Sequence, residues 1–222
     1  MVHILGQATL ADDCGLDGVR PVKQLRARRS RDRLLDAGQK LVVGRPFDAL
    51  SVADIARAAG CSVGAFYLRF RDKDAFFRAL IAQYLAEGRA ETLELFATYT
   101  DDRLIGMLVA QATSRFRRYA GLIRSAIRMR MEDPTVWEPI RRSGHFNADC
   151  FVACLEARRG GKLTVAEEAP VRFAFQVLYG TLNNALVNDP GPLDIADPAF
   201  PVHLERTFRL VLLSTGVPPA LE

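Results

Sequence analysis

The residues best suited to chemistry in this sequence are its cations, which gather in one part of the chain. Residues 20–73 contain 13 Lys and Arg against 5 Asp and Glu, a net charge of +8. Residues 1–19 carry −3 and residues 74–222 carry −1, so the total of +4 conceals a strongly basic segment. Concentrated positive charge is typical of a protein that binds a polyanion. A merely solvated basic surface is the alternative, and composition alone does not decide between them.

The other reactive side chains do not form a recognisable catalytic or metal-binding set. Cys150 and Cys154 lie four residues apart near His145 and Asp149, but zinc requires a fuller set of ligands. We interpret both cysteines as buried structural residues rather than redox sensors, and expect His145 and Asp149 to form a local surface pair. No nucleophile elbow, glycine-rich phosphate loop or triad spacing stands out, so we expect no enzyme, no cofactor and no metal.

Short helices are predicted where the positive charge is concentrated. Apolar residues recur at near-helical spacing up to Gly44, which stands where a helix would end. Ser51 predicts the N-cap of a second helix, and Gly60 supplies the residue without a Cβ atom that a tight turn needs. Ser62 then caps a third helix over residues 63–70. This order, a short helix, a tight turn and a second short helix, is that of a helix-turn-helix.

The rest of the chain predicts long helices, and the alternation that marks strands is missing. We expect these helices over about residues 74–98, 102–119, 121–131, 134–158, 167–188 and 201–214. Pro170 is tolerable only in the first turn of its helix. The expected fold class is therefore all-α, with a mobile N-terminal segment over residues 1–19. A basic arm and a three-helix bundle follow over 20–73, and a larger helical regulatory domain covers 74–222.

Length and composition set the class of protein. The chain has 222 residues, of which 49% are hydrophobic, and this is ample for a buried core. No apolar run approaches the roughly 18 residues of a membrane span, and no secretory signal is visible. Four scattered cysteines make no disulfide framework. We expect a soluble cytoplasmic protein with no membrane partner.

The run from Ser51 to Phe76 resembles the DNA-binding signature of the TetR family of transcriptional regulators. The close resemblance covers residues 28–80, and beyond them only the layout is similar. It implies a homodimeric regulator that binds double-stranded DNA at an inverted-repeat operator, most simply a repressor released by a ligand. The alternative is a helical small-molecule-binding or scaffold protein that binds DNA without reading its sequence.

The resemblance also implies which residues meet the phosphates. Ser51 and Lys73 match the family's phosphate contacts at the starts of two helices, and Tyr67 matches an aromatic residue whose hydroxyl meets a phosphate. Leu68 and Arg69 stand where the family often has two histidines. Arg69 retains the ability to contact a phosphate, whereas Leu68 supplies no charge.

Three further positions match residues that face base edges, namely Val63, Gly64 and Ala65. A Lys or Arg is common where Val63 stands, so readout there is limited to apolar contact, for example with a thymine methyl group. The basic arm, with Arg26 and Arg28, is expected to follow a phosphate strand or enter a minor groove. The alternative for the arm is a disordered, solubilising segment.

The family resemblance implies that the last two helices pair across a two-fold axis. The candidate interface stripes are Ala174, Leu178, Thr181, Ala185, Leu204, Phe208, Val211 and Leu212. The alternative is that these stripes face the chain's own core.

Regulators of this kind bind a small effector among their middle helices. The candidate lining residues are Phe116, Tyr119, Ile123, Ile127, Trp137, Phe146, Phe175 and Tyr179. Their aromatic and aliphatic character suits an apolar or amphipathic ligand, although residues at helical spacing are more often plain core. The dense arginines between 115 and 142 admit an anionic ligand, but solvated helix exteriors explain them more simply.

Overall fold

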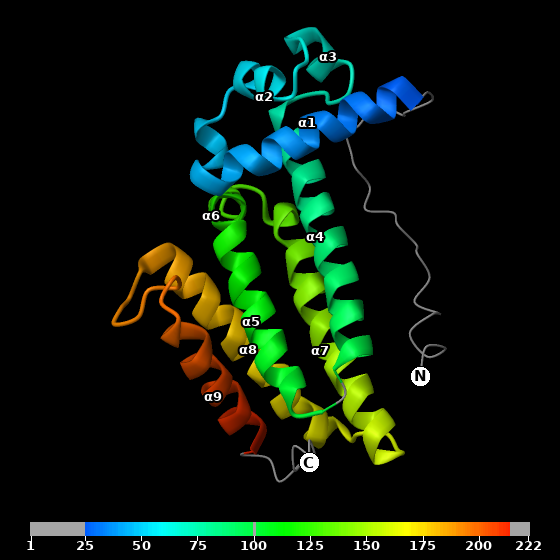
Figure 1. The fold of residues 1–222 in the computed structure, drawn as a ribbon, viewed down its shortest axis with the longest axis vertical. Helices are drawn as coiled ribbons and strands as arrows, with labels where there is room; N and C mark the ends of the chain where they lie inside the picture. The colour runs from blue at the N-terminus through cyan, green and yellow to red at the C-terminus, as the bar shows by residue number, and fades with distance from the viewer. Residues whose placement is uncertain (1–24, 100, 214–222) are drawn as a thin grey trace. The chain divides into compact units, whose positions relative to one another are not determined.

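The computed structural model describes residues 25–99 and 101–213 of the chain. Within these ranges the regular elements are helices and no strand occurs, which confirms the all-α fold class (Figure 1). The expected N-terminal segment, residues 1–19, and the first part of the basic arm, residues 20–24, lie outside the described residues. In the same ranges, none of the helices is long and apolar enough to cross a membrane.

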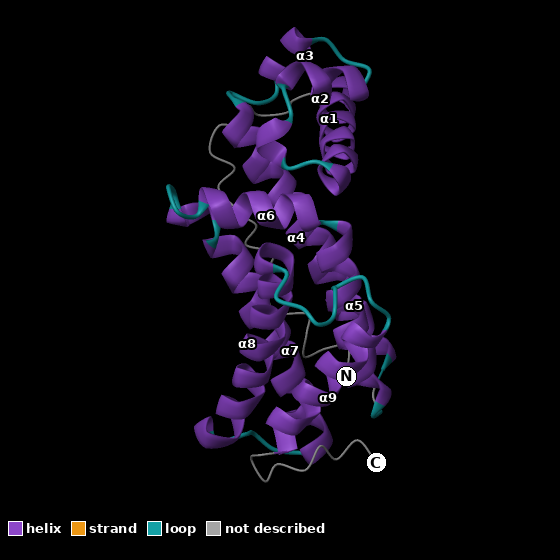
Figure 2. Cartoon of the chain, turned by 90° about the vertical axis from the view of Figure 1, so that its left-hand side faces the viewer, coloured by secondary structure: helices purple, strands orange, loops and turns teal. Residues whose placement is uncertain are grey.

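Short loops connect the helices along the chain (Figure 2). The elements of the first half are α1 (Leu25–Gly44), the 3-10 helix η1 (Phe47–Ala49), α2 (Val52–Ala58), α3 (Val63–Tyr67), α4 (Lys73–Thr98) and α5 (Arg103–Arg118). Those of the second half are α6 (Ala120–Met129), the 3-10 helix η2 (Pro134–Val136), α7 (Glu138–Arg159), α8 (Val165–Asn188) and α9 (Ala199–Leu213). Each predicted helix has a counterpart, but the third ends at Tyr67 rather than near residue 70, and the helix expected from about residue 134 begins at Glu138, after η2.

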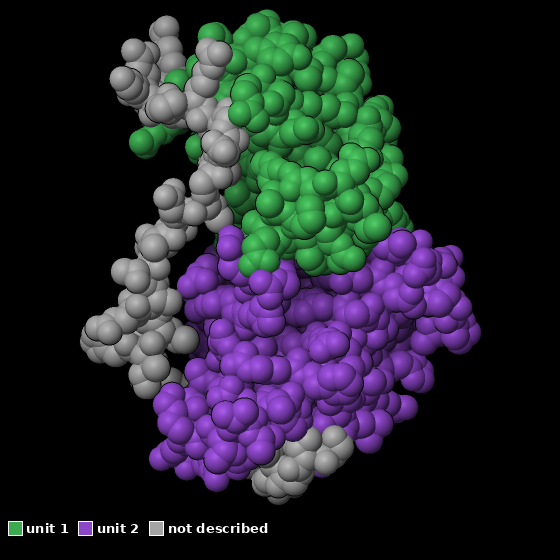
Figure 3. Space-filling view, turned by 180° about the vertical axis from the view of Figure 1, so that it is seen from behind, with its two compact units in different colours: residues 1–87, 119–139 green, residues 88–118, 140–222 purple. Residues whose placement is uncertain are grey.

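The chain forms two compact units, coloured separately in Figure 3. Unit 1 comprises residues 1–87 and 119–139, and unit 2 comprises residues 88–118 and 140–222. This division differs from the single boundary near residue 73 expected from the sequence. The first part of α4 and the whole of α6 belong to the same unit as the helix-turn-helix, because they share its core.

The core of unit 1 is a cluster of phenylalanines that fixes the helix-turn-helix. Phe66 and Phe70 are fully buried, and their ring centroids lie 5.2 Å and 4.9 Å from that of Phe76 in α4. Phe47 of η1 packs against Phe77 with a centroid separation of 4.5 Å. These rings hold α3 against the start of α4, so the outward face of α3 has a defined orientation in unit 1.

Helix α6 lies against α1 and η1 through a hydrogen bond, a close approach of the two backbones and an ion pair. The Phe47 backbone N–H donates to the Ser125 hydroxyl at 2.9 Å, and that hydroxyl donates to the Gly121 carbonyl at 2.9 Å. A Cβ atom on Gly121 would stand 2.0 Å from the Val42 carbonyl oxygen of α1. The missing side chain therefore permits the close crossing of α6 and α1. Arg128 of α6 adds an ion pair with Asp48 of η1 at 2.8 Å.

Unit 2 buries an aromatic core between α7, α8 and α9. The ring centroid of Phe175 in α8 lies 5.9 Å from that of Phe151 in α7 and 5.2 Å from that of Phe208 in α9. Helix α8 starts at Val165, after Thr164, which is the N-cap and forms a capping box with Glu167. The helix begins two residues earlier than predicted, which places Pro170 in the second turn rather than the first.

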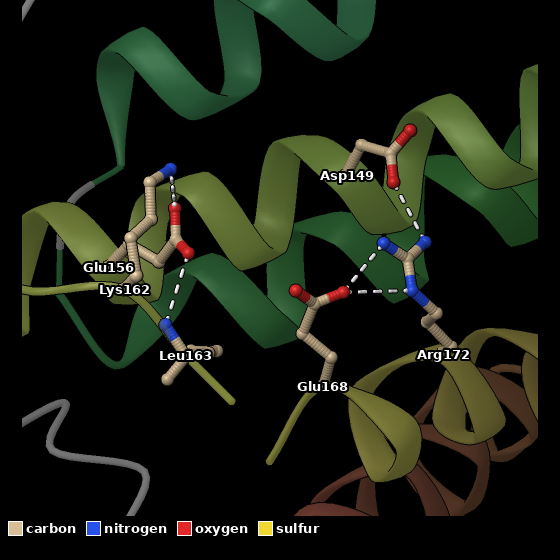
Figure 4. Close-up of polar contacts among 6 residues, drawn as sticks. All are labelled: Asp149, Glu156, Lys162, Leu163, Glu168 and Arg172. Carbon is tan, nitrogen blue, oxygen red and sulfur yellow. Dashed lines mark hydrogen bonds and ion pairs between the residues drawn. The ribbon is translucent and has the colours of Figure 1, made fainter. Parts of the chain in front are cut away.

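Polar contacts join α7 to α8 and to the residues just before α8, at the surface of unit 2 (Figure 4). Arg172 of α8 bridges Asp149 of α7 and Glu168 of its own helix, both at 2.8 Å. Glu156 of α7 accepts hydrogen bonds from the Lys162 amine at 2.6 Å and the Leu163 backbone N–H at 3.1 Å. Asp149 therefore pairs with Arg172 rather than forming the predicted pair with His145, whose ring contacts Arg141 instead.

Candidate nucleic-acid interface

The first helix of the motif begins at a capping box. The backbone N–H of Asp54 donates to the Ser51 hydroxyl at 3.0 Å, while the Asp54 carboxylate accepts from the Ser51 backbone N–H at 3.1 Å. Hydrogen bonds from the Ser51 side chain and backbone lower the pKa of Asp54 below its usual value. Gly60 follows α2 with φ +61°, a left-handed conformation that favours glycine. The turn therefore forms for the reasons that the sequence indicated.

The second helix of the motif, α3, buries one side and exposes the other. Ser62 caps it by accepting from the Ala65 backbone N–H at 3.1 Å. Phe66 is fully buried, whereas Val63, Tyr67 and Leu68 are 43%, 46% and 55% exposed. Three large apolar or aromatic side chains therefore project from the segment that a helix-turn-helix presents to the major groove.

Gly64 lies on the exposed side of α3 and has no neighbour that requires a glycine. A Cβ atom built there would meet only the Ser62 hydroxyl, at an ordinary 3.8 Å. Glycine inside a helix costs about 1 kcal/mol relative to alanine. Neither backbone conformation nor internal packing accounts for Gly64, so its open surface suits the close approach of another molecule.

The predicted phosphate-contacting residues fall at both ends of the motif. The Lys73 amine, at the start of α4, donates to the Asp48 carbonyl at 3.0 Å and lies 4.8 Å from the Phe47 ring centroid. A guanidinium nitrogen of Arg69 donates to the Leu68 carbonyl at 3.2 Å. Ser51 and Tyr67 are exposed. All four belong to unit 1, and the contacts of Lys73 tie it to η1 while leaving its charge at the surface.

One feature of the α4 start opposes an anion. The Asp72 carboxylate accepts from the Ala75 backbone N–H at 2.7 Å and pairs with Arg71 at 2.8 Å. The backbone hydrogen bond from Ala75 and the Arg71 side chain lower the pKa of Asp72, so it is ionised at neutral pH. The Lys73 side chain, rather than free backbone N–H groups, is therefore the better phosphate ligand at this end.

The basic arm continues into α1. Arg28 is exposed in the first turns of this helix. Arg26 also lies in α1, but its side chain is outside the described part of the chain. The last part of the predicted arm, from Leu25, is thus helical.

The predicted ligand-lining residues divide between the units. Tyr119, Ile123, Ile127 and Trp137 belong to unit 1, and Phe116, Phe146, Phe175 and Tyr179 belong to unit 2. In unit 2 the ring centroid of Tyr179 lies 6.1 Å from that of Phe116 and 6.2 Å from that of Phe175. The Arg89 guanidinium lies 3.9 Å from the Phe146 ring centroid. The structure therefore brings three of the eight residues into one aromatic group.

Polar residues that the sequence did not single out adjoin this aromatic group. The Asn147 amide donates to the Tyr179 hydroxyl, and its carbonyl accepts from the Thr92 hydroxyl at 3.1 Å. In unit 1 the Tyr119 hydroxyl donates to Glu87 at 2.8 Å. No sequence signal marked these polar partners, because each pairing joins residues far apart in the chain.

Most of the predicted dimer residues face the core of unit 2. Ala174, Leu178, Ala185, Leu204, Phe208 and Leu212 are buried, Val211 is half-buried and Thr181 is exposed. These six residues keep at most 9% of their surface exposed, which leaves little for a second copy to cover. The six residues therefore fit the own-core alternative. The exposed large apolar residues of these helices are Val165, Phe173, Val187, Val202, Leu210 and Leu213.

The two cysteines of α7 are buried, in agreement with a structural role. Burial raises the pKa of Cys150 to about 11 and raises that of Cys154 as well. Both thiols are therefore protonated at neutral pH and poorly suited to redox sensing. The described residues contain no group of three or more His, Cys, Asp or Glu able to hold a metal.

Comparison with known proteins relates residues 34–80 to a known family. Residues 34–80 match the model of the bacterial regulatory proteins of the tetR family. The chain is 38% identical over 78 residues to YwcC of Bacillus subtilis, a helix-turn-helix-type transcriptional regulator, covering 35% of this chain and 33% of YwcC. It is 33% identical over 72 residues to the helix-turn-helix-type repressor ComR of Escherichia coli, covering 31% and 34%. The matched part thus spans about a third of each relative.

Solved structures of regulators share the fold along most of the chain. A TetR-family regulator from Mesorhizobium loti superimposes with a TM-score of 0.67 and 17% identity, covering 86% of this chain and 98% of that one. The regulator FadR of Bacillus subtilis, solved with stearoyl-CoA, gives a TM-score of 0.59 and 16% identity, covering 82% and 97%. At these identities the likeness concerns the fold alone. The match over residues 34–80 thus relates this region to the tetR family of bacterial regulatory proteins, and the rest of the chain shares the fold of the solved regulators.

Proposed function

We propose that the chain is a sequence-specific DNA-binding transcriptional regulator that acts as a homodimer. The observation that carries this proposal is the outward face of α3. Gly64 is open there, Val63 and Leu68 are exposed, and the aromatic core holds the face in place. This face belongs to the segment that concentrates the chain's excess positive charge. Duplex DNA is the polyanion whose major groove accommodates a helix.

Four residues are proposed to position the duplex through its phosphates. Ser51, Tyr67, Arg69 and Lys73 offer two hydroxyls and two cations at the two ends of the motif. Such contacts fix register and orientation without reading sequence. Arg28 in α1 extends the basic surface toward a neighbouring phosphate.

The experiment that tests the proposal is selection of bound duplexes from a random pool, followed by affinity measurements on the selected site. Recovery of an inverted repeat supports the regulator. A sequence-blind, salt-sensitive pool supports the alternative of a scaffold that binds DNA nonspecifically.

Lys73→Ala should weaken binding to all duplexes and lower the slope of log affinity against log salt by about one unit. Lys162→Ala, which removes the same charge from unit 2, is the control and should leave the slope unchanged.

The proposed dimer uses the exposed faces of α8 and α9, which pack against each other within unit 2. Phe173, Gly180 and Val187 recur every seven residues along α8 and so share one face. Leu210 is 65% exposed on α9. Exposed apolar stripes of this kind mark protein interfaces. Leu210→Asp should shift sedimentation equilibrium toward monomer, and an unchanged dimer would exclude this face.

The proposed effector is a small apolar or amphipathic molecule, and the regulator is proposed to be a repressor that it releases. The aromatic group around Tyr179, with its polar neighbours Asn147 and Thr92, supplies apolar surface and hydrogen-bonding groups inside unit 2. FadR of Bacillus subtilis, which shares the fold, was solved with stearoyl-CoA. The midpoint of thermal unfolding, measured with and without stearoyl-CoA, tests whether the ligand binds. Operator affinity at the same ligand concentration tests whether that binding releases DNA. Stabilisation with loss of operator binding is expected.

A further inference from the structure

The recognition segment lacks the side chains that usually read bases by hydrogen bonding. Residues 60–68 contain no Arg, Lys, Asn, Gln, Asp or Glu, although arginine to guanine and asparagine to adenine are the usual specific contacts. The Ser62 hydroxyl already accepts the cap hydrogen bond from Ala65. Arg69, the next cation along the chain, donates to the Leu68 carbonyl. Any base reading by the outward face of α3 must therefore depend mainly on apolar contact.

Val63 is the residue placed to make that contact. It is the first residue of α3, where a recognition helix meets base edges, and 43% of it is exposed. Its β-branched side chain has one strongly preferred rotamer in a helix, so its two methyl groups are already ordered before binding. Gly64 beside it adds no bulk, and its Cβ position is open apart from the Ser62 hydroxyl at 3.8 Å. The helix can thus come close enough for Val63 to touch the floor of a groove.

The major groove presents one apolar group, the C5 methyl of thymine. We propose that Val63 reads this methyl, so that each operator half-site carries a thymine at the position facing the start of α3. The inference rests on the proposed function, because it requires α3 to dock in duplex DNA. The +8 charge of residues 20–73 favours this polyanionic occupant over a protein partner for the same apolar face.

Deoxyuridine provides a direct test, because it keeps the hydrogen-bonding edges of thymine and lacks only the methyl group. The site is first selected from a random duplex pool, and each thymine of a half-site is then replaced in turn. The dissociation constant of the full chain is measured by fluorescence anisotropy at fixed salt. Replacement in a single half-site should weaken binding about three- to fivefold, and replacement in both half-sites roughly tenfold or more.

Two variants identify the residue responsible. Val63→Ala should reduce the effect of the same replacement to less than twofold, since the side chain that meets the methyl is gone. Val43→Ala is the control, because Val43 is 52% exposed on α1 of the same unit, and it should retain the full effect. Both valines are exposed and alanine is a better helix former than valine, so both variants should fold.

The outcomes separate this inference from the proposed function. Selection of an inverted repeat whose affinity is unchanged by every uracil replacement overturns the inference and leaves the regulator intact. An equal loss for wild type and Val63→Ala also overturns it. Failure to select any repeated sequence overturns both proposals together.

Discussion

Four helical glycines of this chain form two contrasting pairs, one inside unit 1 and one on outward faces of the two units. A Cβ atom on Gly38 of α1 would stand 2.6 Å from the Phe76 ring, and one on Gly121 of α6 would stand 2.0 Å from the Val42 carbonyl oxygen. Gly64 of α3 and Gly180 of α8 show the opposite, because a Cβ atom there would meet no closer atom than one at 3.8 Å. The chain's own packing requires the first pair and does not require the second.

The difference between the two glycine pairs indicates which faces contact another molecule. Glycine in a helix costs about 1 kcal/mol relative to alanine, whether it is buried or exposed. The interior pair offsets this cost by allowing α1, α4 and α6 to cross closely. Nothing in the described part of the chain offsets it at Gly64 or Gly180, and both lie on faces proposed to contact another molecule. Replacing each glycine with alanine should therefore change stability in opposite directions for the two groups.

The largest effect is expected for Gly121→Ala. The new methyl group would overlap the Val42 carbonyl oxygen at 2.0 Å and the Arg45 carbonyl oxygen at 2.9 Å, and backbone atoms move only with their helix. Unit 1 should lose about 3 kcal/mol of unfolding free energy, measured by urea denaturation. Gly144→Ala is the control, since its Cβ atom would meet only the Tyr179 ring at 3.6 Å. Equal stability of the two variants would contradict the close crossing of α6 and α1.

A smaller loss is expected for Gly38→Ala, because its obstacle is a side chain. The Phe76 ring, 2.6 Å from the added atom, belongs to a packed aromatic cluster but can tilt. We expect a loss of about 1–2 kcal/mol in the same urea experiment. Combining Gly38→Ala with Phe76→Leu should give a smaller loss than the sum of the two single changes. Strict additivity of the two would mean that they do not touch.

The sequence predicted the elements whose causes are local. Ser51 and Gly60 mark a cap and a left-handed turn within a few residues, and both are present as predicted. Gly121 carried no such signal, because the need for it arises only when α6 meets α1. The same limit explains the interface stripes. Periodicity identified an apolar face on α8 through Leu178, but only the packed structure shows that this face is buried in the chain's own core.

The candidate ligand group was harder still to predict. Tyr119 and Tyr179 were placed in one lining, yet they belong to different units. Membership of a unit depends on which helices pack together, and apolar composition does not report that. The polar partners Thr92 and Asn147 lie 55 residues apart and form a hydrogen bond only in the folded chain.

On the outward face of α8, Gly180→Ala should stabilise the folded chain and weaken its self-association. No atom lies within 4 Å of the added methyl group, so the helix should gain about 0.5–1 kcal/mol. A second copy packed closely at this point would have to move away, which should raise the dimer dissociation constant several-fold in sedimentation equilibrium. A variant that gains stability while dimerising normally would place the interface elsewhere.

Gly64→Ala should change stability as little as Gly180→Ala does, but it tests the contact with DNA separately from the fold. Alanine there adds one methyl group with an ordinary 3.8 Å contact to the Ser62 hydroxyl, so unit 1 should gain about 0.5–1 kcal/mol in urea denaturation. The selected operator should nevertheless bind more weakly, because the methyl group occupies the space into which DNA is proposed to come. Gly144→Ala serves as the control, because its Cβ atom would meet only the Tyr179 ring at an ordinary 3.6 Å and Gly144 lies in unit 2, outside the faces proposed to contact DNA or a second copy. If Gly64→Ala is stabilised and binds its operator as tightly as wild type, then the open surface of α3 does not meet DNA and the docking proposed for it is wrong.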